Sequence, residues 1–229
     1  MFDSIFNFNI HNRNQFVANE AKLTPTGSTV LDAGAGQCHY KPLFSHCEYR
    51  AQDFAKYPGK EHVYGELDYI CDITEIPVPN ASFDMILCTE VLEHIPRPDL
   101  ALREFSRIIK PGGRLVLTAP LGSGIHMPPY HFYGGFSPYW YEHFCSEHGL
   151  TVESCEPNGG FFKLFGQESR RFAAMARPRS LLLRIALFPL EVVVRVFFSL
   201  LLPVICHLLD GCESEGQFTV GYFVTAQKQ

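Results

Sequence analysis

The sequence predicts a doubly wound α/β fold, in which a mostly parallel sheet is covered by helices on both faces. A short run of β-forming residues at 29–31 leads directly into the glycine turn at 32–36, and a helix-compatible segment follows from Tyr40. The run at 82–88 is almost continuously apolar, as expected of a parallel strand buried on both faces. An amphipathic helix then precedes another apolar strand at 114–119.

The remaining elements follow from local patterns in chain order. A helix is expected over 12–23, because Pro25 and Gly27 would stop it. Asp99 is expected to cap a helix over 100–110, which Pro111-Gly112-Gly113 would end. Ser137 is expected to cap a second helix, which runs through 148. Further elements are expected as a short helix at 40–46 and strands at 48–54, within 63–71, at 150–156 and at 217–227.

The glycine turn favours a cationic ligand. Gly34 and Gly36 lack Cβ atoms, so a ligand can approach the backbone closely. A dinucleotide fingerprint needs a third glycine where this chain has His39, and the ending of a P-loop is absent. The Asp32 carboxylate would repel a diphosphate but attract an ammonium or sulfonium group. Asp53 lies 21 positions further on, where a carboxylate accepts hydrogen bonds from a ribose diol. A structural turn and a solvated aspartate are the alternatives.

Three segments resemble class I S-adenosylmethionine-dependent methyltransferases of the small-molecule type. They are VLDAGAG at 30–36, CDITEIPVPNASFDMILCTEVLEHI at 71–95 and LREFSRIIKPGGRLVLTAP at 102–120. The resemblance implies a Rossmann-like, seven-stranded sheet with an antiparallel last strand and S-adenosylmethionine as cofactor. Asp72 would accept from the adenine amino group, and Ile73 would pack on the ring. The cofactor-binding residues that we expect are Asp32, Gly34, Ala35, Gly36, Asp53, Asp72, Ile73, Thr89 and Glu90.

A long segment at 120–136 follows the fifth strand at the carboxyl edge of the sheet, where loops of this length are usually functional. His126 and His131 are candidate bases, because histidine titrates near neutral pH. Tyr130 and Tyr133 are candidates for orienting the acceptor or contacting the sulfonium methyl. Each of the four could instead have a packing role. The stretch at 126–136 also resembles one found in bacterial methyltransferases associated with surface-polysaccharide synthesis.

The last two strands are separated by a helical insertion at 161–216, which divides the methyltransferase domain into 29–160 and 217–229 after an N-terminal helical segment at 1–28. Five arginines lie within 170–184, and 181–209 is almost wholly apolar. On one helix, Arg184, Glu191, Arg195 and Ser199 would form a single polar stripe. Because the longest uncharged run has 14 residues, we expect 170–209 to lie on an anionic membrane surface rather than span it. A homodimer interface and a cap over the substrate pocket are the alternatives.

Composition excludes several classes of function. The net charge of −5, with dispersed acidic residues, argues against nucleic-acid binding. The eight cysteines form no CxxC pair, so we expect no metal and a reducing, cytoplasmic compartment, at the inner face of the membrane if the insertion binds lipid. The N-terminus shows no signal-peptide pattern. The sequence therefore predicts methyl transfer to an oxygen or nitrogen of a small or lipid-linked acceptor. A non-catalytic, membrane-anchored assembly protein that binds the cofactor is the alternative.

Overall fold

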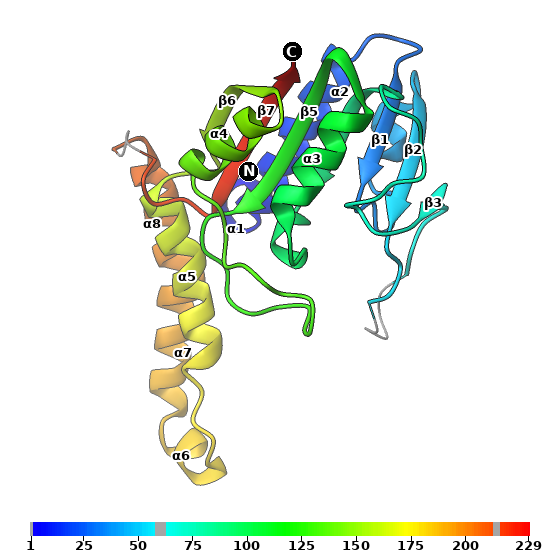
Figure 1. The fold of residues 1–229 in the computed structure, drawn as a ribbon. Coiled ribbons are helices and arrows are strands. Elements are labelled where there is room, and N and C mark those ends of the chain that lie inside the picture. Colours follow the sequence, from blue (N-terminus) through cyan, green and yellow to red (C-terminus); the bar gives the residue numbers. More distant parts are fainter. Residues whose placement is uncertain (1, 58–62, 213–215) are drawn as a thin grey trace. The chain divides into compact units, whose positions relative to one another are not determined.

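The computed structural model describes residues 2–57, 63–212 and 216–229 (Figure 1). The chain forms two compact units. We call Met1–Asn12 with Pro157–Val220 the helical unit, and Arg13–Glu156 with Gly221–Gln229 the sheet unit. The predicted insertion at 161–216 lies within the helical unit.

The sheet has seven strands in the order β3-β2-β1-β4-β5-β7-β6, which confirms the predicted fold class. Strands β1 to β5 pair in parallel, and β7 runs antiparallel to β5. From β1 the chain adds β2 and β3 on one side and then β4 and β5 on the other, so the switch point of the sheet lies between β1 and β4. Ligands of such sheets bind outside the carboxyl ends of the strands at this point. The strands are β1 (Thr29–Ala33), β2 (Glu48–Asp53), β3 (Tyr69–Ile70), β4 (Phe83–Thr89), β5 (Ile109–Pro120), β6 (Leu150–Pro157) and β7 (Gly221–Lys228).

Both faces of the sheet are buried, which explains the continuous apolar run of β4. Met85 and Leu87 face one core cluster, together with Val17 of α2 (Phe8–Leu23). Ile86 faces the other cluster, together with Phe105 of α3 (Pro98–Ile108) and residues of α4 (Pro138–Glu147). Successive residues of a strand point to opposite faces, so a strand covered on both sides is apolar at every position.

Several predicted boundaries and caps are wrong. Helix α3 begins at Pro98, and Asp99 does not cap it but forms an ion pair with Arg97 at 2.6 Å. Ser137 occupies the cap position of α4 without a side-chain cap hydrogen bond. The residues Pro111-Gly112-Gly113 do not end a helix but lie inside β5, where a Cβ on Gly113 would be 2.8 Å from the carbonyl oxygen of Asp84. The helix expected at 40–46 is a 3₁₀ turn, Lys41–Phe44.

The helical unit contains α1 (Phe2–Phe6) and a hairpin of two helical arms. Helix α5 (Phe161–Met175) packs against a second arm made of α7 (Phe188–Val196), a π-helical turn (Phe197–Leu201) and α8 (Leu202–Leu209), as Figure 1 shows. The Ser169 hydroxyl bonds to the carbonyl oxygen of Phe198 at 2.8 Å. The short helix α6 (Leu181–Ala186) lies where the chain turns between the arms.

One expectation for the insertion is wrong. Arg184 belongs to α6, whereas Glu191 and Arg195 belong to α7, so the predicted polar stripe is not on one helix. The helix from Phe188 to Cys212 is continuous for 25 residues, and its most apolar window has a mean hydropathy of 2.4 and is 11% buried. By length and composition it could cross a membrane, although the uncharged run alone could not.

Candidate functional site

A cavity of about 440 Å³ lies in the sheet unit, beside the carboxyl ends of β1, β2 and β4. This is the switch point of the sheet, where the fold predicts a ligand. The cavity combines the glycine loop and acidic strand ends with apolar and aromatic side chains. Its lining residues are Gly34, Gly36, Gln52, Asp53, Phe54, Lys56, Tyr64, Asp72, Ile73, Glu90, Val91, His94, Ile95, Pro96, Met127, Tyr130 and Phe132.

The amides of the glycine loop are bonded to the end of β2. Gly34 and Ala35 donate to the carbonyl oxygen of Gln52 at 2.8 and 2.9 Å, and Gly36 donates to Oδ2 of Asp53 at 2.9 Å. A phosphate-binding loop needs such amides free to face its anion. This loop therefore does not provide a phosphate cradle, as expected from the absence of a P-loop ending in the sequence.

The two glycines have different steric roles. Both have positive φ angles, +76° at Gly34 and +51° at Gly36. A Cβ on Gly34 would be 2.4 Å from a methyl carbon of Val91, so this position must be glycine for the loop to pack. A Cβ on Gly36 would meet no described protein atom within 4 Å. The space in front of Gly36 belongs to the cavity and is available to a ligand.

Asp53 and Asp72 retain acceptor capacity toward the cavity. Asp53 accepts from the amides of Gly36 and Ala55, which uses two of the roughly four acceptor positions of a carboxylate. Oδ1 of Asp72 accepts from the amide and hydroxyl of Thr74, while its Oδ2 accepts no bond from the described residues. Ribose hydroxyls and an adenine amino group are donors that suit these oxygens.

Six of the nine predicted cofactor residues line the cavity. They are Gly34, Gly36, Asp53, Asp72, Ile73 and Glu90. Asp32, Ala35 and Thr89 do not line it. Asp32 is buried, and its Oδ2 accepts from the Tyr49 hydroxyl at 2.6 Å. Burial is the main cause that raises the pKa of Asp32 to about 7; the charge of Asp53 adds to it, and the Tyr49 bond opposes it.

Glu90 lies between the cavity and helix α2. Its φ of +53° is uncommon for a non-glycine residue and is often found at functional sites. The conformation is held by bonds on both sides: the Thr118 hydroxyl donates to Oε1 at 2.9 Å, and Arg13 of α2 pairs with Oε2 at 3.2 Å. Helix α2 therefore supplies a charged residue to the edge of the site.

Glu93 fixes the loop at 120–136. Its carbonyl oxygen accepts from the amides of Phe132 and Tyr133 at 2.9 and 3.2 Å. Its carboxyl is 1% exposed, and burial together with the Glu90 charge raises its pKa to about 8. The Tyr133 hydroxyl donates to the carbonyl oxygen of Pro96 at 3.0 Å, so Tyr133 helps to hold the loop and does not line the cavity.

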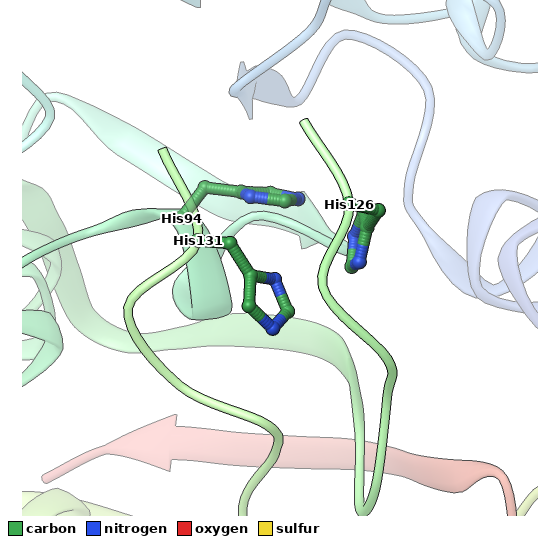
Figure 2. Close-up of side chains that lie close together, drawn as sticks. All are labelled: His94, His126 and His131. Carbon is green, nitrogen blue, oxygen red and sulfur yellow. The ribbon is translucent and has the colours of Figure 1, made fainter. Parts of the chain in front are cut away.

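The loop brings His126 and His131 next to His94 (Figure 2). The ring centroids of His126 and His131 are 4.6 Å apart, and those of His94 and His126 are 4.7 Å apart. Burial lowers the pKa of His94 and that of His131. Tyr130 and His94 line the cavity, whereas His126 and His131 lie beside it. The sequence did not predict this convergence, because His94 is more than 30 positions from the loop histidines.

The glycine loop and the acidic strand ends give this α/β domain the features expected of a nucleoside-binding site. Residues 31–117 match the family model described as a methyltransferase domain. An uncharacterized methyltransferase of Mycobacterium avium is 31% identical over 121 residues, which are 48% of this chain and 47% of that protein. Ubiquinone biosynthesis O-methyltransferase of Xanthomonas axonopodis pv. citri is 32% identical over 108 residues, which are 43% of this chain and 45% of that protein.

Solved structures extend the likeness of fold beyond the matched segment. Geranyl diphosphate methyltransferase in complex with S-adenosylmethionine aligns with a TM-score of 0.57 at 11% identity, covering 95% of this chain and 85% of that one. The chain spans about half the length of the curated relatives it matches. Residues 31–117 are therefore similar to a methyltransferase domain, and the fold is that of solved S-adenosylmethionine-dependent methyltransferases.

Replacing Gly36 with alanine should weaken S-adenosylmethionine binding without unfolding the protein. The added methyl group enters the cavity and strains a left-handed backbone by about 1–2 kcal/mol. Gly112→Ala is a matched control, since Gly112 has a φ of +76°, also has open space around its Cβ position and does not line the cavity. Calorimetry should show binding at least about tenfold weaker for Gly36→Ala alone. Equal affinities in the two variants would contradict this placement of the cofactor.

The buried carboxyl of Asp32 should make stability depend on pH. The folded protein holds this proton more tightly than the unfolded chain, because the pKa is raised from 3.8 to about 7. Relative to Asp32→Asn, the wild type should therefore lose unfolding free energy as the pH rises from about 4 to about 7, by up to about 4 kcal/mol. Denaturant unfolding at several pH values measures this difference. Parallel pH profiles would mean that Asp32 is not buried as described.

Proposed function

We propose that the protein transfers a methyl group from S-adenosylmethionine to an oxygen or nitrogen of a small or lipid-linked acceptor. One observation carries the proposal: a single cavity is lined both by six of the predicted cofactor residues and by residues of the 120–136 loop. Gly36, Asp53 and Ile73 line it together with Met127, Tyr130 and Phe132. A cofactor and an acceptor bound in such a cavity would be held in contact, and methyl transfer depends mainly on this positioning.

The side chains around the acceptor region suit proton removal. The cofactor supplies a methyl group that its sulfonium has already activated. Nδ1–H of His94 donates to the carbonyl oxygen of Tyr130, so its Nε2 carries the lone pair. The lowered pKa keeps this ring neutral near pH 7. His94, or one of the neighbouring His126 and His131, can therefore accept the proton of an acceptor hydroxyl. The edge-to-face contact of Tyr130 with Phe54 orients an aromatic wall of the same cavity.

The helical unit supports association with a membrane surface. Many of its large apolar side chains are exposed, among them Leu182 (79%) and Ile185 (66%) in α6. Arg177, Arg184 and Arg195 line a groove of about 550 Å³ with apolar neighbours, and Glu191 is the acidic residue there. Glu191 pairs with Arg195 at 2.9 Å and with Arg177 at 3.7 Å. A groove with basic and apolar walls suits an anionic lipid headgroup and its adjoining chains.

Chain connectivity favours partial insertion over a single crossing. Strands β6 and β7 are neighbours in one sheet, so the segment between them leaves and returns on the same side of any membrane. If the helix Phe188–Cys212 crossed, α5 would have to cross as well. Helix α5 carries Lys163, Glu168, Arg170 and Arg171, and each charge costs about 2.5–3.5 kcal/mol at the bilayer centre. We therefore propose that the hairpin lies in the interface of one leaflet.

This arrangement is the basis for proposing a lipid-linked acceptor on the cytoplasmic side of the membrane. A protein held at the surface meets membrane-bound acceptors at high local concentration. The resemblance of residues 126–136 to methyltransferases of bacterial surface-polysaccharide synthesis agrees with an acceptor that carries sugar hydroxyls. Ubiquinone biosynthesis O-methyltransferase, a relative over part of the chain, is by its name an enzyme that acts on oxygen.

The catalytic proposal is tested by methyl transfer to membrane extracts. The purified protein is incubated with S-adenosylmethionine labelled on the methyl group and with separated lipid, soluble and protein fractions. We expect label in the lipid fraction and, relative to wild type, a loss of about 10²–10⁴-fold in His94→Ala if this ring is the base. Label in the soluble fraction would point to a small acceptor. Cofactor binding with no transfer to any fraction would favour the non-catalytic assembly protein.

Membrane binding is tested by co-sedimentation with vesicles. We expect the wild type to sediment with anionic vesicles, less with neutral ones, and to be released as salt rises, because each arginine near the surface contributes about 1 kcal/mol. Arg179→Glu with Arg184→Glu should reduce sedimentation strongly. Arg103→Glu, the same charge reversal at an exposed residue of α3, is the control for each of the two changes made singly. A wild type that ignores vesicles and forms a salt-insensitive dimer would show that the hairpin is a subunit interface.

A further inference from the structure

The three histidines beside the cavity have the arrangement of a metal site. One potential ligand nitrogen from each of His94, His126 and His131 lies within 4.8 Å of those of the other two. Two ligand nitrogens bound to one tetrahedral Zn²⁺ are about 3.3 Å apart, from Zn–N distances of about 2.0–2.1 Å. His126 and His131 are both on the 120–136 loop, so small rotations of their side chains can close the difference. Figure 2 shows the three rings around a common space.

Hydrogen bonds fix the rings in the form that binds metal. Nδ1–H of His94 donates to the carbonyl oxygen of Tyr130, and Nδ1–H of His126 donates to that of Gly124 at 2.9 Å. Each bond leaves Nε2 with its lone pair, and this pattern is typical of histidines that bind metal ions. Nδ1 of His131 is buried and has no hydrogen-bond partner among the described residues. A buried nitrogen without a partner is costly unless a ligand occupies it.

The surroundings also suit a cation. Oε1 of Glu93 lies 3.7 Å from Nε2 of His94, so an acidic side chain borders the position of the proposed ion. Cysteine spacing, on which the sequence prediction of no metal rested, does not bear on a site built from distant histidines.

We propose that His94, His126 and His131 bind one divalent transition-metal ion, with Zn²⁺ as the ion that best suits three imidazole ligands. Three protein ligands leave a coordination position open, as in catalytic zinc sites. Because His94 lines the cavity, the open position can take an acceptor oxygen, and a bound ion would then lower the pKa of the acceptor hydroxyl in place of a free histidine base. The role toward an acceptor rests on the proposed function, whereas metal binding does not.

Metal binding is measured directly, with tag-free protein first stripped by a chelator. Zn²⁺ is titrated in competition with a chromophoric chelator, and bound metal is counted after desalting. Co²⁺ serves as a spectroscopic probe, since a tetrahedral site gives visible absorption. We expect one equivalent in the wild type and affinities more than about 100-fold lower in His126→Ala and His131→Ala. His143→Ala, which removes an exposed histidine of α4, is the control and should bind as the wild type does.

Calorimetric binding of S-adenosylmethionine to each variant verifies that the domain remains folded. Less than half an equivalent of Zn²⁺ in the wild type would overturn the proposal. So would undiminished binding in the double variant His126→Ala/His131→Ala, which would assign the metal to cysteines. A protein that binds Zn²⁺ at the histidines but transfers no methyl group would contradict the proposed function and leave the metal site in place.

Discussion

The site depends on the hydrogen bonds between the glycine loop and the end of β2. These bonds use the amides of Gly34, Ala35 and Gly36, which in a phosphate-binding loop would face the ligand. The same contacts place the Asp53 carboxylate at the cavity wall and leave open space in front of Gly36. The ligand selected by this arrangement has hydroxyl and amino donors and positive charge, and S-adenosylmethionine has all three.

The second half of the cavity is built by the 120–136 loop, which is attached to the segment after β4. The carbonyl oxygen of Glu93 holds the amides of Phe132 and Tyr133, and the carbonyl oxygen of Tyr130 accepts from His94. The loop side of the cavity is therefore fixed by hydrogen bonds to Glu93 and His94, of which His94 also lines the cavity. A metal ion at the histidine cluster would therefore be held by the 120–136 loop and by His94, which lie on the two sides of the cavity.

The sequence was sufficient to predict the sheet and six of the residues that line the cavity. The glycine loop and the position of Asp53 at the end of the next strand could be predicted because they depend on residues close together in the sequence. In the structure both line the cavity. Asp32 was placed at the ligand because its charge suits a cation, but the structure buries it under the loop against Tyr49. The cluster of His94 with His126 and His131 was not predicted, since it depends on how a long loop folds back. In the insertion, periodicity could not reveal that one helix ends and another begins between Arg184 and Glu191.

A crystal structure with bound S-adenosylhomocysteine tests the central claim, that one cavity aligns the cofactor with the acceptor region. We predict that the ribose hydroxyls bond to Asp53, that the adenine packs against Ile73, and that the sulfur faces the part of the cavity lined by His94 and Tyr130. A product molecule bound outside this cavity, or one whose sulfur points away from the 120–136 loop, would contradict the account.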